Sequence, residues 1–430
     1  MACPSCANDN AKEARFCGSC GTYIGILSPS QAVTGESDSL RYHGLDALRG
    51  IAMLLGIVLH AALPFIPNIE AFWPADENSS HVTTTIFQFI HIWRMPLFFI
   101  LAGFFANLVI SRTSWKSWWG NRLLRIGLPI AVFSPLMSLT IPWIFKYGST
   151  GEFIFFYSDE GQPFHLWFLW HLIIFVIVTT LFRPIYLLGV IISNRLNRIG
   201  LSFVGSVSGK SRSILSGILF RPRLPVLFII LCCIINLPTW GELIVNPIGS
   251  GLYFVLGYSL YRNSWLSMFL KAHWRSYLLA GFIGFTLYMI LIVTESKNLA
   301  TDIYSDNITS AVGKDIPELM GLLQYLLKIT CGVLFSYAFI GLSESRFGSY
   351  NAKLRFIADG AYWMYLIHLP IVTLITFAML DLQIPVEIKF VIAVGLTSTI
   401  CLGTYKYLVR STFIGLLLNG KRHPFKLTGL

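Results

Sequence analysis

The chain has 430 residues, of which 55% are hydrophobic and 12% are charged, and its formal net charge is +11. Soluble domains carry about 25% charged residues, so this composition excludes a soluble protein and indicates an integral membrane protein. The basic residues lie in short loops between apolar segments, which argues against nucleic-acid binding. No cleavable signal is expected, because the first apolar run follows a polar segment of about 45 residues.

The first residues predict a small metal-binding module. Two Cys-x-x-Cys pairs lie close together there, and four thiolates at this spacing suit a tetrahedral structural zinc: Cys3, Cys6, Cys17 and Cys20. The pattern resembles the small zinc ribbons of many bacterial proteins, with two disulfides or unrelated thiols as the alternative. A zinc ribbon at 1–24, followed by a flexible linker at 25–41, would place the N-terminus in the reducing cytoplasm.

The rest of the chain predicts an all-α polytopic membrane domain at 42–412 and a basic cytoplasmic tail at 413–430. About ten transmembrane helices are expected, centred near residues 56, 97, 133, 176, 231, 255, 285, 331, 368 and 398. With both termini in the cytoplasm, most basic residues fall in inner loops. The outer loops then hold only Lys146, Lys297, Lys314 and Lys389. This distribution fits the positive-inside rule.

The first span carries the most informative polar residues. Arg49 and His60 are eleven residues apart, and three helical turns take about 10.8 residues, so both lie on one helix face. The rise between them is about 16 Å, roughly half the hydrocarbon thickness. Asp46 precedes Arg49 by three residues and is expected to pair with it. Ionisable residues inside a span indicate a functional site; the alternatives are an Arg49 that only anchors the helix and a His60 that bonds a neighbour.

Further polar residues lie in later spans. His91 and Arg94 share one face of the second span, although an interfacial arginine with a nearby histidine would explain them too. Arg122 and Arg125 present two guanidinium groups at the inner end of the third span, which suits phosphate binding, while topology signals also favour such residues.

Two more histidines lie near the predicted membrane centre or outer surface. His368 in the ninth span reaches a depth close to that of His60, as a second catalytic group or as a core histidine bonded to a neighbouring helix. His165 and Trp167 open the fourth span, where an aromatic belt and a sugar-stacking platform are both plausible.

Several of these motifs together resemble the acyltransferase 3 family. They are DALRG with His60 after it, the RMPLFFILAGFF run, RLLR at the third span and YWMYLIHLP near the end. The HIWRMPLFF and HLWFL segments are most similar to the glucan-biosynthesis protein C branch, associated with succinylation of periplasmic glucans. The resemblance covers about residues 41–410 and excludes the cysteine-rich start.

The resemblance implies a ten-helix enzyme of the bacterial inner membrane that moves acyl groups from a cytoplasmic donor to extracytoplasmic glycans. Arg49 and His60 match the family's Arg-x10-His motif, and Arg122 and Arg125 match its RxxR motif. Both motifs are implicated in handling the acyl donor and in the transfer.

The residues themselves support the same chemistry. Acyl transfer from a thioester needs a base, a cationic cradle for the donor phosphates and a group that stabilises the oxyanion. His60 is the expected base or transient acyl carrier. Arg49, Arg122 and Arg125 are expected to bind acyl-CoA, with Asp46 orienting Arg49. Arg94 and His91 would meet a sugar hydroxyl or a succinyl carboxylate.

The sequence therefore predicts a membrane O-acyltransferase that moves an acetyl or succinyl group from acyl-CoA to a glycan or glycolipid. The alternative is a polytopic transporter or a membrane sensor, because polar residues inside spans also mark substrate paths.

Overall fold

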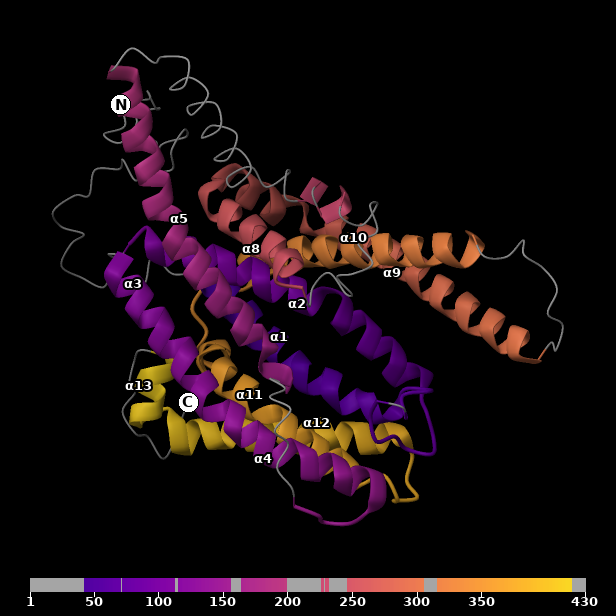
Figure 1. Cartoon of the computed structure of the whole chain (residues 1–430). Helices are drawn as coiled ribbons and strands as arrows, with labels where there is room; N and C mark the ends of the chain where they lie inside the picture. Colours follow the sequence, from indigo (N-terminus) through magenta and orange to yellow (C-terminus); the bar gives the residue numbers. More distant parts are fainter. Residues whose placement is uncertain are drawn as a thin grey trace.

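The computed structural model describes residues 42–70, 72–112, 115–155, 164–198, 226–227, 229–231, 246–304 and 315–419. Every regular element in these ranges is helical (Figure 1). In chain order they are α1 (His43–Ala62), η1 (Leu63–Phe65), α2 (His81–Ile110), α3 (Trp115–Arg122), the π-helical η2 (Leu123–Gly127), α4 (Leu128–Thr150), η3 (Phe164–Leu166), α5 (Trp167–Arg198), α8 (Pro247–Arg262), α9 (Ser264–Tyr304), α10 (Asp315–Arg346), α11 (Ala352–Phe377), α12 (Val386–Thr404), the π-helical η5 (Tyr405–Val409) and α13 (Phe413–Asn419).

The described part contains 7 helical segments long and apolar enough to cross a membrane. They are His43–Phe65, His81–Ile110, Ser117–Thr150, Ser264–Thr294, Met320–Arg346, Ala352–Phe377 and Val386–Val409. Each coincides with a predicted span, which confirms an all-helical, multi-pass membrane protein.

The other three predicted spans differ in status. The one near residue 176 coincides with a shorter apolar helix, Trp167–Leu181, and the one near 255 with α8, which has 16 residues. The one near 231 lies mostly outside the described residues. The count of ten, the orientation of the termini and the zinc ribbon therefore remain predictions, and the four cysteines of the ribbon also lie outside the described residues.

Helix α1 lies at the centre of the bundle. It packs against α2, α10, α11 and α12, and 61% of the residues in its apolar stretch are buried. Gly50 allows the close approach to α11, because a Cβ there would lie 2.9 Å from the backbone nitrogen of Ala358. In the same way a Cβ at Gly103 of α2 would collide with the carbonyl of Phe254 in α8. These contacts fix how the polar faces of the helices meet.

Helices α1 and α11 are neighbours that run in the same direction. Arg49 bonds the carbonyl of Ala358, and eleven residues further along α1 His60 lies beside His368, so α1 and α11 run parallel. We call the end of the bundle that carries Arg49 and Arg122 the arginine end. The opposite end, which carries the loop at residues 66–80, is the loop end.

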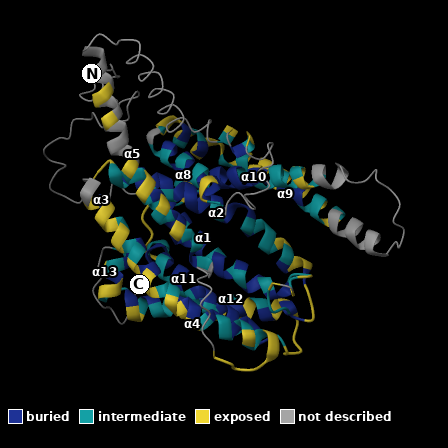
Figure 2. Ribbon diagram, in the orientation of Figure 1, coloured by how far each residue is buried: buried dark blue, intermediate teal, exposed yellow. Residues whose placement is uncertain are grey.

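Burial separates a packed interior from a lipid-facing exterior. Dark blue, buried residues concentrate where α1, α2 and α11 meet, whereas α4 and α12 carry exposed residues on their outer sides (Figure 2). In the apolar stretch of α2, 78% of the residues are buried, whereas only 17% are buried in that of α9. Exposed leucine, isoleucine and valine side chains on a spanning helix suit contact with lipid tails.

Candidate active site

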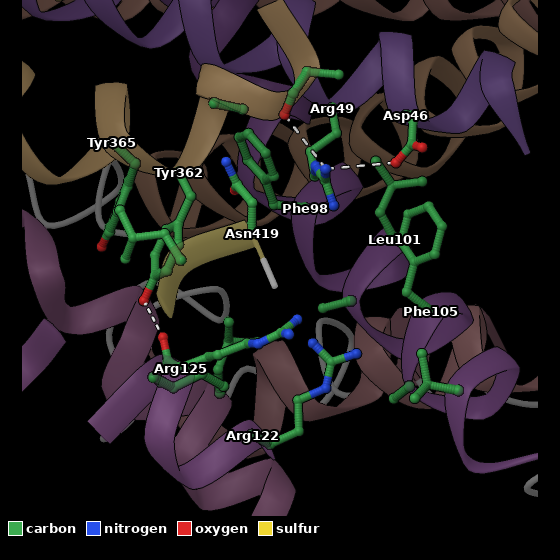
Figure 3. A pocket seen from close by; sticks show the side chains of 18 of the residues that line it. Asp46, Arg49, Phe98, Leu101, Phe105, Arg122, Arg125, Tyr362, Tyr365 and Asn419 are labelled. Carbon is green, nitrogen blue, oxygen red and sulfur yellow. Dashed lines mark hydrogen bonds and ion pairs between the residues drawn. The ribbon is translucent and has the colours of Figure 1, made fainter. Parts of the chain in front are cut away.

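A cavity of about 550 Å³ opens at the arginine end, between α1, α2, η2, α5 and α11 (Figure 3). Its wall is unusually charged for the interior of a membrane bundle. It includes five arginines and two aspartates: Arg49, Arg112, Arg122, Arg125, Arg355, Asp46 and Asp359. Such a wall suits a large anionic ligand.

The two aspartates are held by one arginine. Arg355 Nη1 lies 3.0 Å from Asp46 Oδ2, and Arg355 Nη2 lies 2.6 Å from Asp359 Oδ1. Its Nε also donates to Asp359 Oδ2 at 2.9 Å. Asp46 additionally pairs with Arg49 at 3.4 Å, as predicted from their spacing. Because Arg355 and Arg49 together balance the two carboxylates, the other three arginines leave the cavity positively charged.

Arg49, Arg122 and Arg125 approach this space from opposite sides. Arg49 comes from α1, while Arg122 and Arg125 come from the α3–η2 segment, and Figure 3 shows the three side chains around one central space. Within the described part of the chain, neither Arg122 nor Arg125 forms an ion pair with a carboxylate. The structure thus brings the predicted donor-binding arginines together, with guanidinium groups available to phosphates.

Arg125 lies in a π-helical turn. Leu123–Gly127 follows a π rather than an α pattern, and π turns inside α-helices occur frequently at functional sites. Tyr362 of α11 donates its hydroxyl to the carbonyl of Arg125 at 2.7 Å. This bond ties the turn to the helix that carries Asp359 and His368.

Sequence reasoning missed several members of this cavity. Arg355 was expected only among the inner-loop basic residues, and Asn419 belonged to the predicted tail. Asn419 lines the cavity and donates to the carbonyl of Asp359 at 2.9 Å. The tail boundary predicted at residue 413 is where α13 begins, and α13 packs on the bundle.

Toward the histidines the cavity is lined by Met53, Phe98 and Tyr365, and His60 is absent from its lining. Arg49 and His60 lie on one helix face, as predicted, but only Arg49 lines the cavity. Helical periodicity places both on one face, yet Met53, two turns before His60, is where the space on that face ends.

Beyond this end lies a cluster of three imidazoles, which we call the histidine cluster: His60, His165 and His368. The ring centroids of His60 and His368 are 5.2 Å apart, and those of His165 and His368 are 5.1 Å apart. His60 and His368 were predicted at similar depth. His165 was expected at an aromatic belt or sugar platform, and only the packing of η3 on α11 brings it here.

The backbone fixes the tautomers of two of these histidines. His368 Nδ1 lies 3.0 and 2.9 Å from the carbonyls of Met364 and Tyr365, so Nδ1 donates. His165 Nε2 donates to the carbonyl of Tyr365 at 2.9 Å. In the neutral rings the other nitrogens are then acceptors. Within the part of the chain that the structure describes, His368 Nε2, His165 Nδ1 and His60 Nδ1 have no hydrogen-bond partner.

Tyr365 connects the cavity to the histidine cluster. Its hydroxyl donates to the carbonyl of His165 at 2.6 Å, while its own carbonyl accepts from the His165 ring. Tyr365 also lines the cavity, and its ring contacts those of His165 and His368, so its side chain lies between the cavity and these two imidazoles.

Arg94 brings a buried positive charge next to the cluster. Its side chain is 6% exposed, its Nε donates to the carbonyl of Ala52 at 3.2 Å, and its guanidinium lies 5.7 Å from the ring of Phe98. The structure gives it no carboxylate partner among the described residues. Burying such a charge is costly, so an anionic group is expected to approach it during function.

His91 takes a different position from Arg94, although both lie on α2. Its ring stacks on Phe87 of the same helix, with centroids 5.2 Å apart and an interplanar angle of 15°.

Lys389 also departs from its predicted place in an outer loop. It lies in the first turn of α12, 1% exposed, and its ammonium is 2.5 Å from Asp76 Oδ2. Among the described residues, no group of three or more histidine, cysteine, aspartate or glutamate side chains could hold a metal ion.

Comparisons with known proteins identify relatives by sequence. Glucans biosynthesis protein C of Shigella dysenteriae is 30% identical over 148 residues, which are 33% of this chain and 38% of the relative. The protein of the same name from Escherichia coli is 35% identical over 100 residues, 23% of this chain and 25% of the relative. The chain thus matches about a quarter to two-fifths of the length of these relatives. No solved structure matches it.

A match to a family covers far more of the chain than these relatives do. The family described as "Acyltransferase domain" matches residues 42–406, which contain the five arginines of the cavity and the histidine cluster. The chain therefore belongs to the acyltransferase 3 family of membrane acyltransferases.

Proposed function

We propose that this protein is a membrane O-acyltransferase that takes an acyl group from acyl-CoA at the arginine end and transfers it to a glycan hydroxyl at the loop end. The observation that carries this proposal is the arrangement of the two sites. A cationic cavity and a histidine cluster lie on the same helices, with the Tyr365 side chain between them. The family match favours an enzyme over the transporter or sensor alternative.

The arginine cavity would bind the donor. Arg49, Arg122 and Arg125 offer forked donors that match phosphate oxygens, and the shared wall carries no uncompensated carboxylate. From there the pantetheine arm would run along Met53 and Phe98. Its extended length is comparable to the rise of about 16 Å from Arg49 to His60. The thioester would reach the histidine cluster when Phe98 or Tyr365 moves aside.

The chemistry then uses His60 and Arg94. The unpartnered His60 nitrogen takes the proton from the acceptor hydroxyl, and that oxygen attacks the thioester carbonyl. The carbonyl oxygen becomes an oxyanion, which the buried Arg94 guanidinium stabilises. The intermediate collapses to the ester, the C–S bond breaks, and the CoA thiolate recovers the proton from the imidazolium. His368 would relay or share that proton.

The acyl group and acceptor follow from chemistry and from the relatives' name. Both relatives carry a name that refers to glucan biosynthesis. A buried arginine with no carboxylate partner could also receive the free carboxylate of a succinyl group, whereas an acetyl group has none. With the arginine end in the cytoplasm, the acceptor would arrive from the extracytoplasmic side, as the positive-inside distribution indicates.

An acyl-transfer assay with donor and acceptor on opposite sides of a vesicle membrane tests the proposal. The full chain is reconstituted in vesicles with radiolabelled succinyl-CoA or acetyl-CoA on one side and a short glucose oligosaccharide on the other. Labelled oligosaccharide is expected only when donor and acceptor face the arginine and loop ends, respectively. Absence of label with either donor, while the protein still binds CoA, would contradict the assigned acceptor. Label formed with both substrates on one side would contradict the proposed path.

A further inference from the structure

The loop at residues 66–80, described except for residue 71, is firmly attached at the loop end. The backbone nitrogens of Asp76 and Ser80 donate to the carbonyls of Pro64 and Phe65 at 2.9 and 3.0 Å. The Asp76 carboxylate pairs with buried Lys389 of α12, whose ammonium also donates to the carbonyl of Leu380 at 2.8 Å. Ser80 Oγ further bonds Glu387 at 2.8 Å. The loop is therefore fixed relative to α1 and α12.

This attachment holds Trp73 against the histidine cluster. The indole packs edge-on to Phe145 and Phe377, at interplanar angles of 76° and 68°. Its face is instead nearly parallel to the His60 ring, at 19° and with centroids 6.5 Å apart. That separation is at the long end of the range for aromatic pairs, so the two faces are not in close contact.

Two polar atoms at this contact lack partners. Trp73 Nε1 and His60 Nδ1 are both enclosed by protein and have no hydrogen-bond partner among the described residues. An enclosed indole N–H usually finds an acceptor, and leaving it unpaired costs free energy. Both side chains keep part of their surface exposed, so a ligand that contacts this surface gains the two nitrogens once it displaces the atoms that cover them.

A sugar ring supplies what this pair lacks. The C–H face of a pyranose packs on an aromatic face, its hydroxyl or ring oxygens accept from an indole N–H, and a neighbouring hydroxyl can donate to an imidazole nitrogen. A purely aliphatic alcohol would satisfy the apolar face but not both nitrogens.

We propose that Trp73 is the platform on which the acceptor sugar stacks, which places one sugar hydroxyl at His60. This inference rests on the proposed function, because it assigns the acceptor side of the same site. Trp73 is thus an acceptor-specificity residue, and Asp76 and Lys389 position it through the loop.

The test compares Trp73→Leu and Trp73→Phe with the wild type, and with Trp143→Leu as the matched control. Trp143 is a partly buried tryptophan near the same end of α4, packed on Phe153 and Phe155 rather than on a histidine. The full chain in detergent is examined for acceptor KM, donor KM and direct binding of a short glucose oligosaccharide by saturation-transfer NMR. We expect Trp73→Leu to raise the acceptor KM about tenfold and to remove the NMR signal. Donor KM should not change, and Trp143→Leu should match the wild type.

Trp73→Phe keeps an aromatic face and loses only the N–H, so it should retain most of the binding. The proposal would be overturned if Trp73→Leu kept the wild-type acceptor KM. It would also be overturned if Trp73→Phe, with an unchanged melting temperature, were as defective as Trp73→Leu. A wild-type protein that binds no oligosaccharide would overturn it too. If the wild type binds the oligosaccharide through Trp73 but never acylates it, the platform stands and the proposed function fails.

Discussion

The two halves of the site differ in how they are built. The arginine cavity is wide, is lined by five arginines, and leaves several guanidinium groups without carboxylate partners. The histidine cluster is compact, and backbone carbonyls at 2.9 to 3.0 Å orient the imidazoles of His165 and His368. A wide cationic surface can bind a large anion through several replaceable contacts. A compact cluster with fixed tautomers suits proton transfer, where one atom has one role.

This difference predicts that mutations at the histidine cluster affect the rate and that mutations at the arginine cavity affect donor affinity. The largest effect is expected for His60→Ala. Loss of a general base typically costs about 10²- to 10⁴-fold in rate, so kcat should fall by that factor while the CoA dissociation constant stays unchanged. Steady-state kinetics and CoA binding by calorimetry measure the two quantities.

The control for this variant is His273→Ala, because His273 is an exposed histidine on α9. A His60→Ala enzyme with normal kcat, or one that loses CoA binding as well, would break the division between the two halves.

Arg94→Met should have the next largest effect. Without the guanidinium the oxyanion loses its charged partner, and losses of about 10²- to 10³-fold in kcat are typical for such groups. If Arg94 instead holds a succinyl carboxylate, the loss will be confined to succinyl-CoA and acetyl transfer will persist. Parallel assays with the two donors distinguish these roles, and equal activity of variant and wild type with both donors would exclude them.

Arg122→Ala and Arg125→Ala should act mainly on donor binding. A hydrogen bond to a charged group is worth about 1.5–3 kcal/mol, so each variant should raise the donor KM by roughly 10- to 100-fold with little change in kcat. The effect should shrink at high salt. Arg346→Ala, at an exposed position at the end of α10, serves as the control. A fall in kcat at saturating donor would show that these arginines also serve the chemical step.

The smallest effect is expected for Gly56→Ala. A Cβ at Gly56 would collide with Nη2 of Arg94, so the guanidinium must shift. Small displacements at a reacting centre can cost up to about 10²-fold, and here the flexible side chain should limit the loss to about tenfold in kcat. Gly395→Ala on α12 is the matched control, because a Cβ there meets no atom within 4 Å. Equal kcat for both variants would argue against a role for the exact position of Arg94.

Local periodicity predicted those parts of the site that lie within one helix. The spacing of Asp46 and Arg49 correctly predicted their ion pair, and Arg122 and Arg125 line the same cavity. Helical geometry could not show where the cavity ends, because Phe98 and Tyr365 belong to other helices. Periodicity also placed His60 correctly relative to Arg49, but it gave no information about what lies between the cavity and the cluster.

The contacts that were missed join distant parts of the chain. Arg355 and Asp46 are 309 residues apart, and His165 and Tyr365 are 200 apart. Such pairs depend on close helix approaches like that at Gly50, which set the relative depth of two helices. Charge counts alone assigned Arg355 and Lys389 to loops, whereas each compensates an aspartate inside the bundle.

The π-helical turn at Leu123–Gly127 has a consequence for how the donor site could be lost. Its extra residue offsets the helical register between Arg122 and the membrane-spanning part of α4. Removing one residue would restore regular α geometry and rotate the preceding segment by about 100°, which would turn Arg122 away from Arg49. Deletion of one residue would thus give a more regular helix and a poorer donor site. The position of Arg122 is therefore more sensitive to insertions and deletions in this turn than to substitutions.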